Sequence, residues 1–143
     1  MVRKIGGVIA GIVVAVVTVM AIQALGHAFY PYPADIDLRD PEQIAAAFPS
    51  IPVAAKLFVV AAWFGGALLG GIAAKLIAER RWAAWTVAGL IAVGGVMNLF
   101  IIPHPVWMQI AAVAAPFVGG MIAGHVGRRK GDDAATEARD AQI

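Results

Sequence analysis

Residues 53–78 read VAAKLFVVAAWFGGALLGGIAAKLIA, an apolar stretch with two charged side chains, Lys56 near its start and Lys75 near its end. The hydrocarbon core of a bilayer is spanned by about 20 consecutive, mostly apolar residues. Because hydrocarbon offers no water to the backbone, such a stretch has to satisfy its peptide groups internally, as an α-helix does. The stretch therefore predicts a transmembrane helix.

Three further stretches have the same apolar character and predict helices over 5–26, 82–102 and 106–127. On one side of the membrane, a loop over 27–52 joins the first two of the four helices and a turn over 103–105 joins the last two. The composition is 61% hydrophobic and 14% charged, whereas soluble domains average about 45–50% apolar and about 25% charged residues. We therefore expect an all-α fold, an integral membrane four-helix bundle made of two helical hairpins.

The positive charges predict the orientation of this bundle. Nine of the 11 Lys and Arg residues fall on one side of the predicted spans, and only Arg39 and Lys56 fall on the other. The nine are Arg3, Lys4, Lys75, Arg80, Arg81, Arg128, Arg129, Lys130 and Arg139. Since cytoplasmic segments are enriched in Lys and Arg, residues 1–4, 79–81 and 128–143 are expected in the cytoplasm. We expect a multi-pass protein of a bacterial inner membrane with both termini cytoplasmic.

The first apolar stretch has one alternative interpretation, a signal peptide that is cleaved near Gly26 or Ala28. Signal peptides combine a positively charged start, an apolar segment of about 7–15 residues and small residues at the cleavage site. The stretch over 5–26 is longer than such a segment. We therefore expect it to stay in the protein as a helix.

The loop that follows the first helix carries signals for a short helix of its own. Asp40 is a preferred N-cap residue, Pro41 suits the first helical position, and Gln43 can reach back to the Asp40 backbone as in a capping box. These residues predict a helix over 41–48. We expect its apolar side, which includes Phe48, to lie on the outer membrane surface, so that the helix covers the bundle as a lid.

The chain also contains a faint internal repeat. The pattern Val-Ala-Ala-x-Phe-x-Gly occurs over 60–66 and again over 113–119. If a duplication produced it, the two hairpins are related by an axis along the membrane normal. Chance agreement in an Ala- and Gly-rich sequence is the alternative.

Six glycines occur in pairs four residues apart, so each pair lies on one face of a predicted helix. They are Gly7 and Gly11, Gly66 and Gly70, and Gly120 and Gly124. Small residues at this spacing let two helix backbones approach closely within lipid. We expect packing inside the bundle. The alternative is a face that joins copies of the chain in a homo-oligomer or docks onto a larger membrane complex.

Polar side chains near the outer ends of the helices are the candidate ligand-binding residues. They are Gln23, Lys56, Asn98, Gln109, His27 and His104. If they point inward, they form a polar cup in which Lys56 binds an anionic headgroup or pairs with acidic residues of the loop, and in which the histidines titrate or hold a metal. The alternative is that Lys56 extends to the surface, the amides are interfacial or bond between helices, and His104 only shapes a turn.

The aromatic residues and the missing motifs narrow the function further. Trp63, Trp82, Trp85 and Trp107 are typical of the aromatic belt at a membrane interface. The absence of cysteine excludes thiol redox chemistry and thiolate metal sites. No acidic residue falls in the middle of a predicted span, which argues against a proton-coupled exporter, and the histidines stand at the helix ends, which argues against haem. No catalytic or phosphate-binding motif is present.

Two function classes remain, and neither requires a cofactor or a bound metal. The first is a non-enzymatic structural or accessory membrane component that packs through its glycine-rich faces. The second is a protein that binds or transports a small ligand or lipid through the polar cup. Membrane lipids are the expected partners. Nucleic acid is not expected, because membrane topology accounts for the positions of the basic residues.

Overall fold

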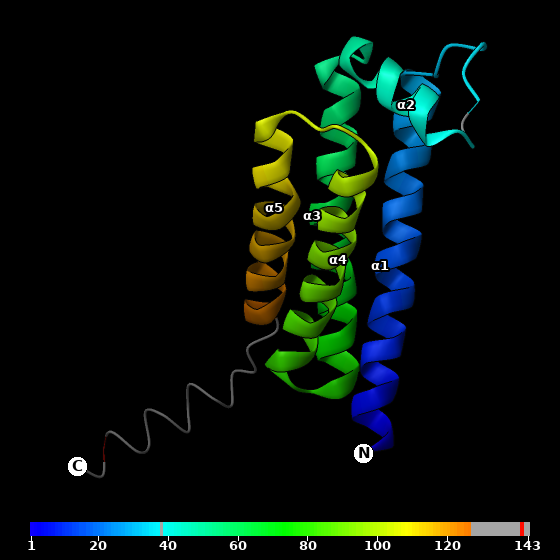
Figure 1. The fold of residues 1–143 in the computed structure, drawn as a ribbon. Helices are drawn as coiled ribbons and strands as arrows, with labels where there is room; N and C mark the ends of the chain where they lie inside the picture. The colour runs from blue at the N-terminus through cyan, green and yellow to red at the C-terminus, as the bar shows by residue number, and fades with distance from the viewer. Residues whose placement is uncertain (38, 127–140, 142–143) are drawn as a thin grey trace.

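The computed structural model describes residues 1–37, 39–126 and 141. The elements are the long helices α1 (Val2–Phe29), α3 (Val53–Ala78), α4 (Arg81–Ile101) and α5 (Val106–His125), the short helix α2 (Pro41–Ala47) and a 3-10 turn, η1 (Phe48–Ser50) (Figure 1). Each of the four long helices is long and apolar enough to cross a membrane. The predicted all-α, integral membrane four-helix bundle with a short helix in its first loop is confirmed.

Helix α3 lies at the centre of the bundle and packs against α1, α4 and α5. Helix α1 follows α3 along its length and touches α4 to a smaller extent, while α5 packs against α3 and α4. Equivalent positions of the sequence repeat therefore have different neighbours. A Cβ added at Gly66 would meet Val19 and Ala15 of α1, whereas one added at Gly119 would meet the backbone of α3. The repeat in sequence is not a repeat in packing, and the duplication stays a prediction.

Glycines allow α1 to lie directly on α3. A Cβ added at Gly11 would come within 2.7 Å of the Gly70 carbonyl oxygen, and one added at Gly70 would come within 2.6 Å of the Gly11 carbonyl oxygen. A Cβ added at Gly7, one turn of helix nearer the chain start, would come too close to Ala78 of α3. At this separation the helices are held by close van der Waals contact rather than by interlocking large side chains.

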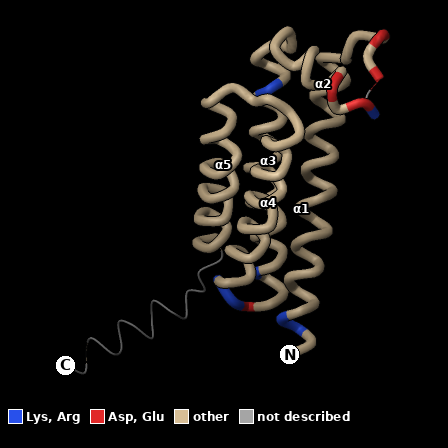
Figure 2. The backbone as a smooth tube through the Cα atoms, in the orientation of Figure 1, with Lys and Arg blue, Asp and Glu red and all other residues tan. Residues whose placement is uncertain are grey.

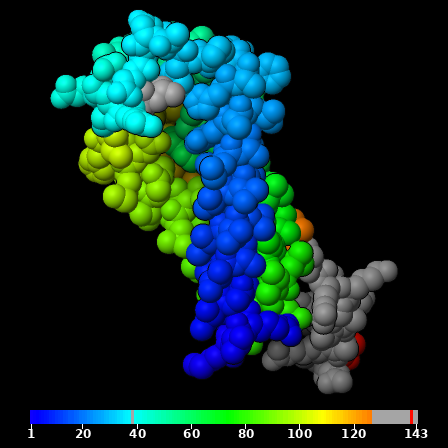
Figure 3. All heavy atoms as spheres, turned by 90° about the vertical axis from the view of Figure 1, so that its right-hand side faces the viewer, coloured from blue at the N-terminus to red at the C-terminus, as the bar shows by residue number. Residues whose placement is uncertain are grey.

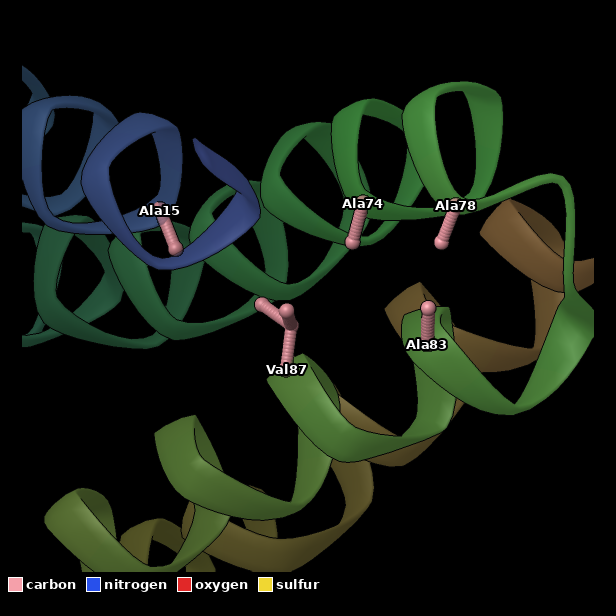
Figure 4. Close-up of a cluster of buried hydrophobic side chains, with 5 residues drawn as sticks. All are labelled: Ala15, Ala74, Ala78, Ala83 and Val87. Carbon is pink, nitrogen blue, oxygen red and sulfur yellow. The ribbon is translucent and has the colours of Figure 1, made fainter. Parts of the chain in front are cut away.

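Two apolar clusters fill the interior. One joins α1, α3 and α4 through small side chains, which Figure 4 shows pointing toward one another: Ala15, Ala74, Ala78, Ala83 and Val87. The other consists of Phe48, Trp63, Met108 and Ala112. Trp63 is only 4% exposed, so its assignment to the aromatic belt was wrong. A tryptophan in a membrane helix is as well accommodated by a protein core as by an interface, because its ring is largely apolar.

The two ends of the bundle differ in charge (Figure 2). At one end, which we call the basic end, lie Arg3, Lys4, Lys75, Arg80 and Arg81. At the other end the loop over 30–52, which we call the lid, carries four of the five acidic residues among those that the structure describes: Asp35, Asp37, Asp40 and Glu42. The basic cluster over 128–130 lies outside the described residues.

Hydrogen bonds and an ion pair fasten the basic end. Helix α3 ends at Ala78, and the next residue, Glu79, has a left-handed φ of 53°. The Glu79 carboxylate pairs with Arg3 at the start of α1. Across the bundle, the Lys75 ammonium donates hydrogen bonds to the carbonyl oxygens of Gly124 at 2.9 Å and Val126 at 2.6 Å. A cation at the carboxyl end of a helix satisfies carbonyl groups that have no partner within the helix.

Candidate functional site

A cavity of about 490 Å³ lies at the lid end of the bundle. Its walls come from the last turns of α1, the first turns of α3, the end of α4 and the lid. The volume falls in the range of about 300–1,000 Å³ that is usual for small-ligand sites. Most of the lining is apolar or aromatic, with a few polar side chains among it.

Five of the six predicted ligand-binding residues line this cavity: Gln23, His27, Lys56, Asn98 and His104. The sixth, Gln109, does not. Its side chain is exposed, and its amide donates a hydrogen bond to the His104 carbonyl oxygen at 2.9 Å. Helix α5 turns its neighbour Met108 toward the core, which directs Gln109 outward because successive residues of a helix point about 100° apart.

Lys56 places a positive charge inside the cavity. Its side chain is only 8% exposed, and its ammonium lies 4.9 Å from the centre of the Phe48 ring. Within the described part of the chain it makes no hydrogen bond and no ion pair, so the pairing with acidic loop residues that the sequence allowed is not formed. A cation–π contact offsets part of the cost of burying an ammonium, but buried charges are normally paired with an opposite charge.

Two amide side chains lie in the same cavity with their hydrogen-bonding groups uncommitted. Gln23 and Asn98 are half-buried, and neither side chain makes a hydrogen bond to another residue that the structure describes. An amide offers two donors and one acceptor oxygen. Together with Lys56, these groups form a set of donors that matches a ligand rich in acceptors.

His104 closes the cavity at the turn between α4 and α5. Its Nδ1 donates a hydrogen bond to the Ile102 carbonyl oxygen at 2.6 Å, so in the neutral ring Nε2 is the acceptor. The ring is 6% exposed and packs against Phe48, with ring centres 4.7 Å apart, and against Trp63. His104 is therefore both a turn residue and part of the cavity wall.

His27 occupies the opposite rim of the cavity. It is exposed, and its ring lies 5.0 Å from that of Tyr32. Burial raises the pKa of the Tyr32 hydroxyl above its ordinary value. In the residues that the structure describes, no three His, Asp or Glu side chains gather as they would around a metal ion.

The lid helix begins at Pro41 with Asp40 as its N-cap, as the sequence predicts. The Asp40 carboxylate accepts a hydrogen bond from the Glu42 N–H at 2.9 Å and another from the Gln43 amide at 3.0 Å. These bonds lower the pKa of Asp40. The expected capping box is not formed, because the Gln43 oxygen accepts from the Asp37 N–H while the Asp40 N–H donates to the Asp37 carbonyl oxygen.

Phe48 anchors the lid in the bundle. Helix α2 ends at Ala47, and the η1 turn that follows directs the Phe48 side chain inward, where it is 5% exposed. The prediction that Phe48 lies on the membrane surface was wrong. Apolar side chains are equally suited to lipid and to a protein core, so periodicity did not separate the two. Pro49, within the turn, and Pro52, after it, were the sequence signal that the chain changes direction here.

Comparison with protein-family models, with curated proteins and with solved structures gives no match to this chain. The class of the protein therefore follows from its own fold, which is that of a small multi-pass membrane protein. Its main feature is a cavity beneath the lid, with Lys56 in the cavity wall.

Proposed function

We propose that this chain is a non-enzymatic membrane protein that binds an organic anion in the cavity beneath the lid. The observation that carries the proposal is Lys56, a residue only 8% exposed that lines the cavity and has no anionic partner among the described residues. An anion that enters the cavity can accept a charge-assisted hydrogen bond from the Lys56 ammonium, and such bonds are stronger than those between neutral groups.

The rest of the cavity supports the same conclusion. Asn98 and Gln23 supply neutral donors in the same cavity as the cation. Phe29, Phe58 and Ile102 supply apolar surface for a hydrocarbon part of the ligand. Small-ligand sites commonly combine a mostly apolar lining with a few polar groups that fix orientation.

The charge distribution supports an orientation for the proposed site. With the basic end in the cytoplasm, as the enrichment of cytoplasmic segments in Lys and Arg favours, the lid and its cavity face the periplasm of a bacterial inner membrane. Both termini are then cytoplasmic. In this arrangement the site receives ligands from the outer leaflet or from the periplasm.

The accessory role through glycine-rich faces is the second candidate function. Its main support is weakened, because Gly11, Gly66 and Gly70 are used in contacts between helices of the same chain. One observation still favours it: a Cβ at Gly89 or Gly94 of α4 would meet no atom within 4 Å. These two positions leave open backbone on the outside of the bundle.

Extraction in mild detergent followed by native mass spectrometry tests the binding proposal. We expect the wild-type chain to retain an anionic molecule and Lys56→Met to retain at least several-fold less. Lys4→Met is the matched control, because it removes the same charge from the exposed start of α1. Equal retention by wild type and Lys56→Met would overturn the proposal, and a stoichiometric protein partner without any retained anion would favour the accessory role.

A further inference from the structure

The cavity opens sideways, between two transmembrane helices. In the half of the bundle near the basic end, α1 and α4 meet through Ala15 and Val87, with Ile91 packed against the same cluster (Figure 4). Nearer the lid, Gln23 of α1 and Asn98 of α4 both line the cavity. The contact between α1 and α4 therefore gives way to the cavity.

The space-filling view shows a hollow in this region. Figure 3 looks onto α1, and between its upper part, the end of α4 and the lid the surface is hollowed, with atoms of α3 visible inside. Lys56 and Phe58 of α3 belong to the cavity lining. The cation of the cavity thus stands on the helix that forms the back of this hollow.

The opening lies at the depth of the membrane. At 1.5 Å per residue, Gln23 is roughly 9 Å before the end of α1 and Asn98 roughly 5 Å before the end of α4. At the same level of the two helices the outward side chains Leu25, Met97 and Phe100 are apolar and more than half exposed. This level of the bundle surface therefore suits hydrocarbon, which favours an amphiphile over a water-soluble ion.

We infer that the anion is the headgroup of an outer-leaflet lipid, which enters between α1 and α4 with its acyl chains left in the bilayer. This inference rests on the proposed function and specifies its ligand. The headgroup lies beside Lys56, Asn98 and Gln23, and the first part of the chains passes Ile102 toward the gap between the helices. One ammonium matches one negative charge. The site therefore suits a phosphodiester headgroup such as phosphatidylglycerol better than a phosphomonoester, which carries about two charges.

A pair of matched variants tests the route of entry without touching the cavity wall. Gly94 follows Ile91 by three residues and precedes Asn98 by four, so it lies on the side of α4 that faces the opening. Gly89 is five residues away, about 140° around the helix. An added Cβ has open space at both positions, so neither Gly94→Trp nor Gly89→Trp creates a clash at its Cβ. Only Gly94→Trp places an indole in the entrance.

The experiment places the full chain in nanodiscs of phosphatidylcholine with added phosphatidylglycerol and measures the lipid retained by native mass spectrometry. The soluble probe is glycerophosphoglycerol, which is the same headgroup without acyl chains. We expect the wild type to retain phosphatidylglycerol over phosphatidylcholine, with a loss of about tenfold in Lys56→Met and in Gly94→Trp. Gly89→Trp should match the wild type, and glycerophosphoglycerol should not displace the lipid.

Two other outcomes separate the inference from the proposed function. If glycerophosphoglycerol binds as tightly as the lipid, depends on Lys56 and is indifferent to Gly94→Trp, lateral entry of a lipid is overturned while anion binding stands. If neither probe depends on Lys56, both are overturned.

Discussion

The Lys56 ammonium lies 4.9 Å from the centre of the Phe48 ring, so the charge of the cavity and the anchor of the lid are in direct contact. Phe48 also packs against His104, which belongs to the turn between α4 and α5. One aromatic side chain of the lid thus contacts both the cation that lines the cavity and the far wall of the cavity. Ligand binding and lid position are expected to depend on each other.

Replacing Phe48 with alanine should release the lid. The side chain is 5% exposed in a cluster with Trp63 and Met108, and truncating a buried phenylalanine typically costs about 3–5 kcal/mol. We expect faster hydrogen exchange over 41–51, measured by mass spectrometry, and weaker ligand retention. Phe100→Ala is the control, since Phe100 is 87% exposed. Unchanged exchange in Phe48→Ala would mean that Phe48 does not hold the lid.

Adding a side chain at Gly11 should separate α1 from α3. A Cβ there would meet the Gly70 carbonyl and Ala74 at less than normal contact distance, and overpacking costs about 1–3 kcal/mol or more. We expect Gly11→Leu to lower the midpoint of thermal unfolding in detergent. Gly6→Leu, on the same helix with open space at its Cβ, should leave the midpoint unchanged. Equal midpoints for the two variants would contradict the packing described here.

The lid helix should respond to acid through Asp40. Hydrogen bonds from the Glu42 N–H and the Gln43 side chain hold the pKa of Asp40 below its ordinary value of 3.8. A carboxylate with a lowered pKa in the folded state stabilises that state above its unfolded pKa, and this stabilisation is lost as the pH falls through the folded pKa. We therefore expect the NMR signal of the Glu42 amide to be constant at neutral pH and to shift below pH 3.8.

The conservative variant Asp40→Asn isolates this titration. Asparagine caps helices about as well as aspartate but has no charge to lose. The same amide signal should therefore stay constant over the acid range. A shift of equal size in Asp40→Asn would assign the acid response to another group.

Cysteine labelling tests which side of the membrane each end faces. The chain has no cysteine of its own, so single substitutions at the exposed positions Glu42 and Lys4 report separately on the lid and on the basic end. In intact bacterial spheroplasts, an impermeant maleimide should label Glu42→Cys at once and Lys4→Cys only after lysis. The reverse pattern would place the lid in the cytoplasm.

The four helices were predictable because hydrocarbon forces an apolar stretch of sufficient length into a helix regardless of its neighbours. The meeting of several polar side chains at one end of the bundle was largely predictable for a related reason. Gln23, Lys56 and Asn98 stand near the same ends of their helices, so any compact bundle brings them to one level. The outward direction of Gln109 was not predictable, because it depends on how α5 packs against the other helices. The inward direction of Phe48 was not predictable either, because the lipid and the protein core both favour apolar residues.

The hydrogen bonds from Lys75 to Gly124 and Val126 join positions 49 and 51 residues apart. During biosynthesis, α3 is made well before the carbonyl groups that Lys75 holds. The hydrogen bonds that join α3 to α5 at this end therefore form only after the last of the four helices has been made. A nascent chain that has not yet reached residue 124 has neither of the carbonyl groups that accept these hydrogen bonds from Lys75.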